Sequence, residues 1–251
     1  MKTTAILIFL LLMTGSICRA QHQEGWVDDY QGVLGNHKIR ISLIVVGSDV
    51  SGEYFYLRWL KNIPFKGKIE GRKIVLNELD EKGKVVAVFD GHFPEYAPEY
   101  LNEPIKFEVI EGEWFRPDGA ERKRFRLVLE DSVGLMGDNR YSVAGFNDDK
   151  VVETAAQKFK NAVIVQDKRK VASLVNYPIS VKIEDKTVVI KKREDFIKMY
   201  NKIFNRPIFD QIKESVPHNM FAKADGVMLG DHGEIWIGSI NGKAKIIAIN
   251  K

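Results

Sequence analysis

Cysteine is almost absent from this chain of 251 residues, since Cys18 is the single one. A secreted protein without cysteine pairs has no disulfides and must be stabilised by its hydrophobic core. An excess of one charge is also lacking, because 38 lysines and arginines face 34 aspartates and glutamates. The net charge of +4 is too small to favour a nucleic-acid partner, and we expect none. With 45% hydrophobic and 29% charged residues, the composition excludes disordered and fibrous proteins.

Long hydrophobic runs are lacking too. A membrane-spanning helix needs about 20 apolar residues, and the apolar run Ala5–Met13 is much shorter, so we expect no transmembrane segment. Lys2 before this run and Cys18-Arg19-Ala20 after it complete the pattern of a secretory signal peptide. We therefore predict a signal peptide at residues 1–20, cleaved near Ala20, and a periplasmic or secreted protein. Ile17 directly before Cys18 disfavours lipidation of that cysteine.

Motifs of catalysis and cofactor binding are lacking as well. The sequence contains neither Gly-x-Ser-x-Gly nor His-Glu-x-x-His, and no glycine-rich nucleotide loop joins a strand to a helix. None of the histidines is paired with another at the spacing of metal ligands; they are His22, His37, His92, His218 and His232. We predict no cofactor, no metal site and no catalytic residue, which leans away from an enzyme.

The segment 21–130 carries the alternation of β-strands. Ile39, Ile41, Leu43 and Val45, for example, alternate with other residues, and glycine-containing turns separate such stretches. Strands separated by turns every 8–12 residues are typical of sandwiches and barrels, and short connections favour antiparallel hairpins. Seven or eight such strands close most easily into an up-and-down barrel, which leaves no exposed edge. We predict an all-β domain here, a barrel or a sandwich.

The segment 131–150 has no periodicity and contains three glycines among aspartates and asparagines, so we interpret it as a linker. It has few residues that could anchor a core. We therefore expect the two halves of the chain to fold separately and proteases to cut first after Arg140.

Beyond the linker, at 151–251, the repeat becomes helical and then returns to strands. Asp167 is placed to cap a short helix that ends before Pro178. The residues of a second amphipathic helix follow the spacing i, i+3, i+4, i+7, i+8; they are Phe196, Met199, Tyr200, Ile203 and Phe204. The terminal strands are expected at Met220–Leu229, Glu234–Gly238 and Ala244–Ile249. We predict an α+β domain with helices on a curved antiparallel sheet, in a two-domain protein.

Each half resembles a known kind of fold. The N-terminal half resembles a bacterial extracytoplasmic module of repeated hairpins and is similar in layout to avidin-like barrels; the matching residues are Gly32-Val33-Leu34-Gly35, Gly52-Glu53-Tyr54-Phe55-Tyr56, Ile63-Pro64-Phe65-Lys66-Gly67 and Gly112-Glu113-Trp114. The C-terminal half resembles the nuclear-transport-factor-like, or SnoaL-like, cone in its order of two helices, strand, helix and terminal strands. That fold includes enzymes and binding modules. Its enzymes often carry an Asp–His pair, which this sequence does not place on the corresponding elements.

The first candidate binding segment is His92–Pro104, which is rich in proline, glutamate and tyrosine. A long connection at a barrel mouth often carries recognition, and tyrosine adds contact area at low entropic cost. The candidate binding residues are Tyr96, Glu99 and Tyr100. A solvated loop whose tyrosines pack on the barrel explains the same residues equally well.

The second candidate is the cluster Asp231, His232, Glu234 and Trp236, with Tyr200 as a further member. A carboxylate, an imidazole and an indole at one end of a sheet could frame a small site. The alternative is an ordinary hairpin turn in which Trp236 fills the core, because aspartate and glycine are common turn residues.

Together these features favour a secreted or periplasmic, non-enzymatic binding or protein-interaction protein. Its partner is expected to be a protein, as for an inhibitor or an immunity-type binder, or else a glycan or a small molecule. The alternative is a small-molecule enzyme of isomerase or hydrolase type that uses the C-terminal cone. Its acid–base groups would be Asp231, His232, Glu234 and Tyr200.

Overall fold

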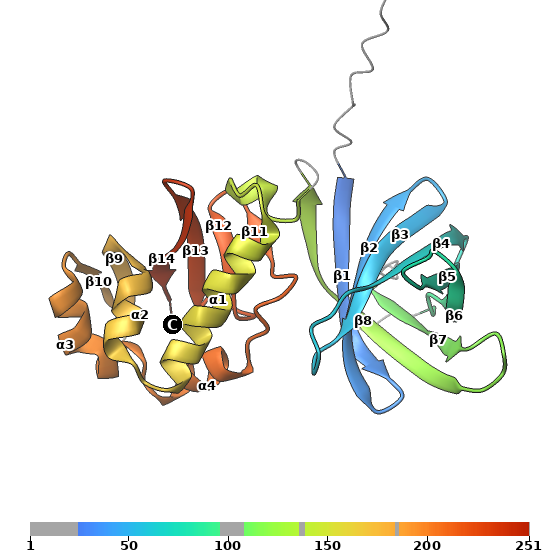
Figure 1. Cartoon of the computed structure of the whole chain (residues 1–251), viewed down its shortest axis with the longest axis horizontal. Coiled ribbons are helices and arrows are strands. Elements are labelled where there is room, and N and C mark those ends of the chain that lie inside the picture. Colours follow the sequence, from blue (N-terminus) through green and yellow to red (C-terminus); the bar gives the residue numbers. More distant parts are fainter. Residues whose placement is uncertain (1–24, 96–107, 136–138, 184–185, 251) are drawn as a thin grey trace, which may run out of the picture.

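The computed structural model describes residues 25–95, 108–135, 139–183 and 186–250. It shows a β-barrel beside a domain of helices packed on a sheet (Figure 1), which confirms the predicted two-domain α+β class. The signal peptide predicted at 1–20 lies outside the described residues, as do Tyr96, Glu99 and Tyr100. None of the helices in the described part of the chain is long and apolar enough to cross a membrane.

The N-terminal domain is a closed barrel of eight strands, each antiparallel to the next, and β1 pairs with β8 to close it. This order confirms the predicted up-and-down layout of hairpins. The strands are β1 (Gly25–Leu34), β2 (His37–Val46), β3 (Asp49–Tyr56), β4 (Ile63–Glu70), β5 (Lys73–Leu79), β6 (Val85–His92), β7 (Val109–Phe115) and β8 (Arg122–Leu135).

The alternation of side chains explains why this barrel is filled. Ile39, Ile41 and Leu43 of β2 are buried in its interior, because successive side chains of a strand point to opposite faces. Gly52 of β3 faces β2 so closely that a Cβ there would lie 1.9 Å from the carbonyl oxygen of Ser42. Glycine is therefore required where these two strands approach the second domain.

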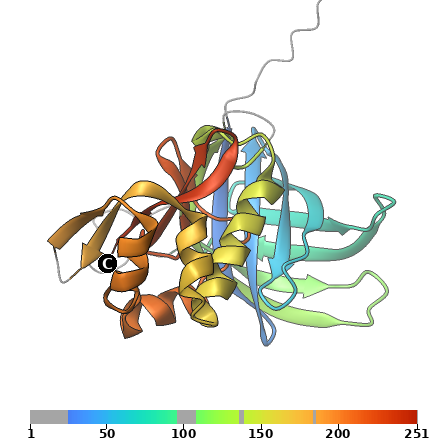
Figure 2. The same ribbon diagram turned by 60° about the vertical axis from the view of Figure 1, so that its left-hand side comes forward.

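The C-terminal domain places its helices against one face of a six-stranded sheet (Figure 2). The sheet is mixed, because β9 and β14 pair in parallel, and this corrects the expectation of a purely antiparallel sheet. The helices are α1 (Asp149–Ile164), α2 (Lys168–Leu174), α3 (Arg193–Ile203) and α4 (Arg206–Glu214). In spatial order the strands are β10 (Lys186–Ile190), β9 (Val175–Ile183), β14 (Lys243–Ile249), β13 (Ile235–Ile240), β12 (Gly226–Leu229) and β11 (Ala222–Lys223).

The ends of these elements follow local chemistry. The side chain of Asp167 accepts a hydrogen bond from the backbone N–H of Lys170, which confirms it as the cap of α2. Asn241 and Gly242 both have positive φ, 50° and 72°, as a two-residue hairpin turn between β13 and β14 requires. The segment expected to be one strand, Met220–Leu229, is instead the short hairpin of β11 and β12.

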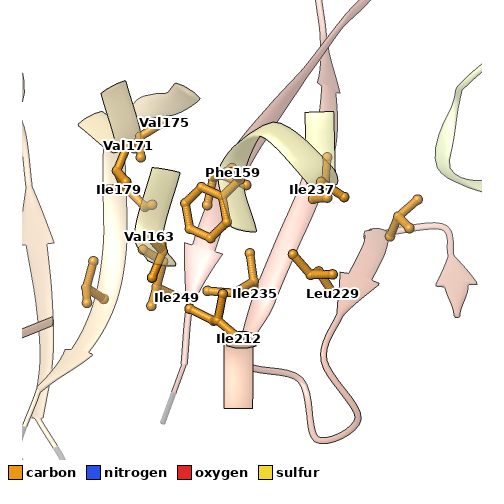
Figure 3. Packing of buried hydrophobic residues seen from close by; sticks show 14 of the residues in the cluster. Phe159, Val163, Val171, Val175, Ile179, Ile212, Leu229, Ile235, Ile237 and Ile249 are labelled. Carbon is orange, nitrogen blue, oxygen red and sulfur yellow. The ribbon is translucent and has the colours of Figure 1, made fainter. Parts of the chain in front are cut away.

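The core of this domain lies between the helices and the sheet. Phe159 and Val163 of α1 point toward Ile235 and Ile249 of the sheet (Figure 3). Burying each such side chain contributes roughly 1.5–3 kcal/mol relative to exposure. Phe196, Tyr200 and Phe204 fill the same core from the side of α3, so aromatic rings occupy the interior of this domain.

The segment interpreted as a linker is more ordered than expected. Its first five residues continue β8 to Leu135, and its last two begin α1 at Asp149. Tyr141 and Phe146 are buried in the core of the C-terminal domain, and Val133 of β8 joins the same core. The expectation that this segment has few residues able to anchor a core was therefore wrong, because large apolar side chains stand among its glycines.

Candidate functional site at the domain junction

The predicted cluster at Asp231–Trp236 spans the turn between β12 and β13 and the first two residues of β13. The buried carboxylate of Glu234 accepts a hydrogen bond from the backbone N–H of His232 at 3.0 Å. The indole Nε1 of Trp236 donates to the carbonyl of Gly233 at 3.1 Å. These two contacts satisfy polar groups within the turn, as the turn alternative expects. The expectation that Trp236 fills the core was wrong. Trp236 is half-buried and lies on the opposite face of β13 from the buried Ile235 and Ile237.

Tyr200 is not brought together with this turn. It lies on α3, which packs on α2, β9 and β10, and its ring lies 4.6 Å from that of Phe204. Burial raises the pKa of the Tyr200 hydroxyl to about 12, and the Asp167 carboxylate adds to this shift. The ammonium of Lys168 lies 5.5 Å from the centre of the ring. Tyr200 is therefore a core residue.

Asp231 differs from the rest of the cluster because it reaches the other domain. Its Oδ1 lies 3.3 Å from the Nη2 atom of Arg40 on β2, an ion pair between the two domains. This contact lies at the junction of the barrel with the C-terminal domain, where further polar side chains converge.

Arg140, between β8 and α1, joins the two domains. Its Nη1 donates to Asp29 Oδ1 on β1 at 3.2 Å, and its Nη2 contacts the second oxygen of the same carboxylate. Its Nε donates to the carbonyl of Met220 in the C-terminal domain at 2.9 Å. Burial acts to lower the pKa of this guanidinium, but the Asp29 carboxylate outweighs burial and raises it. The charged form is thus the one that the junction stabilises.

A second set of contacts centres on His218, between α4 and β11. Its Nδ1 lies 2.8 Å from Glu153 Oε2 on α1, and its Nε2 lies 2.6 Å from Asn62 Oδ1 in the β3–β4 loop. The edge of its ring meets Phe55 of β3, with the centroids 4.6 Å apart. The histidine therefore connects the helical domain to the barrel through both ring nitrogens.

The carboxylate of Glu153 is a central acceptor at the junction. Its Oε1 accepts from the Tyr141 hydroxyl and from the backbone N–H of Asn219, each at 3.0 Å. Burial acts to raise the pKa of this carboxyl, but the hydrogen bonds from His218, Asn219 and Tyr141 outweigh burial and lower it. Glu153 is thus held as a carboxylate.

The orientation of Asn62 settles how His218 is bonded. Asn62 Nδ2 donates to Glu53 Oε1, which also accepts from Asn219 Nδ2 at 3.0 Å. Because a carboxylate only accepts, the amide nitrogen of Asn62 must face Glu53 and its oxygen must face His218. Both ring nitrogens of His218 then face oxygen acceptors. The imidazole donates to both only when each nitrogen carries a hydrogen.

A cavity of about 510 Å³ opens beside this network. Its volume lies within the range of roughly 300–1,000 Å³ that small-molecule sites occupy. Both domains supply its walls, from the outer face of β1–β3 and from α1 and the turn of His218; the lining residues are Val27, Ser42, Ile44, Gly52, Glu53, Asn62, Arg140, Asp149, Lys150, Glu153, His218 and Asn219. We take this cavity as the candidate functional site.

Sequence reasoning did not identify these residues as a site. Glu53 and Asn62 belong to the barrel, whereas Glu153 and His218 belong to the other domain, and no local motif unites them. One signal was available, because His218 stands between two buried residues, Pro217 and Met220, outside regular structure. A polar residue held between buried neighbours needs a partner.

No protein-family model matches the chain, and comparisons with curated proteins and with solved structures gave no significant match.

Proposed function

We propose that this chain is an extracytoplasmic, non-enzymatic binding protein that holds a small polar molecule in the cavity between its two domains. The observation that carries the proposal is the cavity of about 510 Å³ lined by charged and apolar side chains from both domains. Binding sites occur preferentially at such domain interfaces. The signal-peptide pattern at 1–20 and the likeness to avidin-like barrels and nuclear-transport-factor-like cones support the same proposal.

The chemistry of the ligand follows from which lining groups are already bonded. Arg140 uses its guanidinium on Asp29 and Met220. The oxygens of Asp149 accept from the backbone N–H groups of residues 140 and 141. Within the described residues, the Lys150 ammonium and Glu53 Oε2 have no such partner. A cation and a carboxylate oxygen beside Val27 fit a zwitterionic molecule with an apolar body, such as a short peptide.

The pair His218–Glu153 is the observation that favours an enzyme as the second candidate. A histidine oriented by a carboxylate is a common acid–base arrangement. Here, however, the second nitrogen of His218 lies 2.6 Å from Asn62 Oδ1, where a substrate would have to bind. The interior of the C-terminal domain, where the alternative placed its site, is filled by Phe196 and Phe204. The contacts at the junction therefore favour binding over turnover.

The test is a calorimetric titration of residues 21–251 with a panel of di- and tripeptides. We expect at least one peptide to bind and to raise the melting temperature, because a ligand that binds only the folded state stabilises it. Lys150→Ala and Glu53→Gln should each weaken binding about tenfold or more. Lys158→Ala, an exposed lysine on the same helix outside the cavity, is the control and should leave binding unchanged.

Binding that survives both cavity variants would place the ligand elsewhere and contradict the proposal, as would failure of every peptide in the panel to bind. Chemical conversion of a bound peptide, followed by mass spectrometry, would favour the enzymatic candidate instead.

A further inference from the structure

A second cluster of aromatic and charged side chains lies at one mouth of the barrel, away from the lining of the junction cavity. β2 begins at His37, β3 ends at Tyr56, β5 ends at Leu79 and β7 ends at Phe115. Because neighbouring strands are antiparallel, these strand ends meet at the same end of the barrel. We call the group the mouth cluster; its members are His37, Tyr54, Tyr56, Trp59, Glu78, Trp114 and Lys123.

The outer part of the mouth cluster is aromatic. The rings of Tyr56 and Trp59 lie 5.0 Å apart at 65°, and those of His37 and Tyr56 lie 5.8 Å apart at 84°. Trp59 is nevertheless 61% exposed. An indole that is held in place by neighbours and still open to solvent offers its face for contact with a ligand.

The backbone around Trp59 is fixed in an unusual way. Leu60, the next residue, has a φ of 51°, in the left-handed region that bulky side chains rarely adopt. The N–H groups of Trp59 and Leu60 both donate to the carbonyl of Tyr56, at 2.9 and 3.0 Å. Strained backbone of this kind is found most often at functional sites. Here the strained turn sets Trp59 beside Tyr56.

The inner part of the mouth cluster is polar. Glu78 Oε2 accepts from the Tyr54 hydroxyl at 2.7 Å and from Trp114 Nε1 at 3.1 Å. Its second oxygen, Oε1, has no partner among the described residues and is not among their buried unpaired atoms. The ammonium of Lys123 lies 5.3 Å from the centre of the Trp114 ring and 2.7 Å from Glu121 Oε1. Glu78 and Lys123 thus contact the buried rings of Tyr54 and Trp114. The ring of Tyr54 lies 5.8 Å from that of Tyr56, which connects this polar part to the outer aromatic part.

We propose that the mouth cluster binds a neutral sugar residue of a glycan. The C–H groups on one face of a pyranose carry partial positive charge and fit the negative face of an indole such as Trp59. The sugar hydroxyls can donate to Glu78 Oε1 and accept from Lys123. Because carboxylates and an ammonium stand together, neither a cationic nor an anionic ligand is favoured over a neutral one. The inference does not rest on the function proposed for the junction.

The test uses residues 21–251 with cellohexaose, maltohexaose and chitohexaose as neutral probes, followed by tryptophan fluorescence and calorimetry. We expect at least one probe to bind, and Trp59→Ala to weaken that binding tenfold or more. Trp59 is exposed, so this variant should keep its melting temperature. Trp26→Ala is the matched control, because Trp26 is 66% exposed on β1 and outside the mouth cluster, and should leave binding unchanged.

Glu78→Gln removes the charge but keeps a side-chain oxygen, and should weaken binding of the same probe several-fold. Three outcomes would overturn the proposal: no binding of any neutral probe, binding that Trp59→Ala does not affect, or binding of tetramethylammonium in preference to all three sugars. The last result would identify the mouth cluster as a cation site.

Discussion

The guanidinium of Arg140 lies against the carboxylate of Asp29, a residue 111 positions earlier in the chain. The exposed fractions of the two side chains are 9% and 13%. Asp29 also accepts a hydrogen bond from the hydroxyl of Ser42 at 2.6 Å. The carboxylate is therefore bonded both to a neighbouring strand of the barrel and to the segment that leads into the other domain. This pair joins the first strand of one domain to the segment that leads into the other.

Replacing Arg140 by alanine should strongly destabilise the protein. Removing one partner of a buried ion pair leaves an uncompensated charge, at a cost of about 3–5 kcal/mol. We expect a loss of that size in the free energy of unfolding, measured with urea. Arg124→Ala, an exposed arginine of β8, is the control and should change it by less than about 0.5 kcal/mol. A small loss for Arg140→Ala would show that the pair is solvated.

Arg140 is also a poor first site for a protease, since its side chain is largely buried and bonded. This argues against the cleavage after Arg140 that the sequence predicted.

The stability of the junction should depend on pH through Glu153. Its pKa in the folded state lies below its ordinary value of 4.5. The stabilisation it provides is therefore fully present above about pH 4.5 and is lost as the pH falls through the folded-state pKa. We expect the melting temperature to drop on acidification below that pH, and Glu153→Gln to drop less steeply. Glu214→Gln, at the exposed end of α4, should follow the unmodified chain. Parallel curves for all three proteins would contradict this assignment.

Two buried tyrosines should respond in opposite ways to loss of the hydroxyl. The Tyr141 hydroxyl donates to Glu153 and accepts from the backbone N–H of Met220 at 2.9 Å, so Tyr141→Phe should cost about 1–3 kcal/mol. The Tyr200 hydroxyl is buried without a hydrogen-bond partner among the described residues, so Tyr200→Phe should be neutral or stabilising. Chemical denaturation of both variants measures the contrast. Equal losses would show that the Tyr200 hydroxyl is bonded after all.

The two domains should still fold separately, because each has its own buried cluster. We expect fragments 21–138 and 139–251 each to show a cooperative thermal transition in calorimetry. Both should be less stable than in the whole chain, since the cut exposes Val133 and separates Arg140 from Asp29. If neither fragment shows a transition, the domains form one folding unit.

The parts of the fold that the sequence revealed depend on neighbours along the chain. Alternation of Ile39, Ile41 and Leu43 is enough to predict a strand with one buried face, and Asn241-Gly242 is enough to predict a hairpin. Trp236 shows where such reasoning ends. It stands in an apolar run, so alternation alone does not say whether it or Ile235 and Ile237 face the core.

The candidate site depends on residues that only the fold brings together. His218 and Asn62 are 156 positions apart, and they come into contact only when the two domains pack together. The neighbours of His218 show at most that it needs a partner, and no spacing rule could have identified Asn62 as that partner. Trp59 was missed for a related reason, because its exposure depends on the conformation of one turn.

Closure of the barrel by β1 and β8 has a consequence for how the chain folds. Strand β1 is synthesised first, but its second partner, β8, is the last strand of the barrel to be made. Pairing β1 with β8 must therefore overcome a large loss of chain entropy. Hairpins between neighbouring strands can form before that step. Arg140, a few residues beyond the end of β8, then meets Asp29 on β1. Hydrogen-exchange labelling during refolding should therefore find the β1–β8 amides protected later than those of the β2–β3 and β4–β5 hairpins.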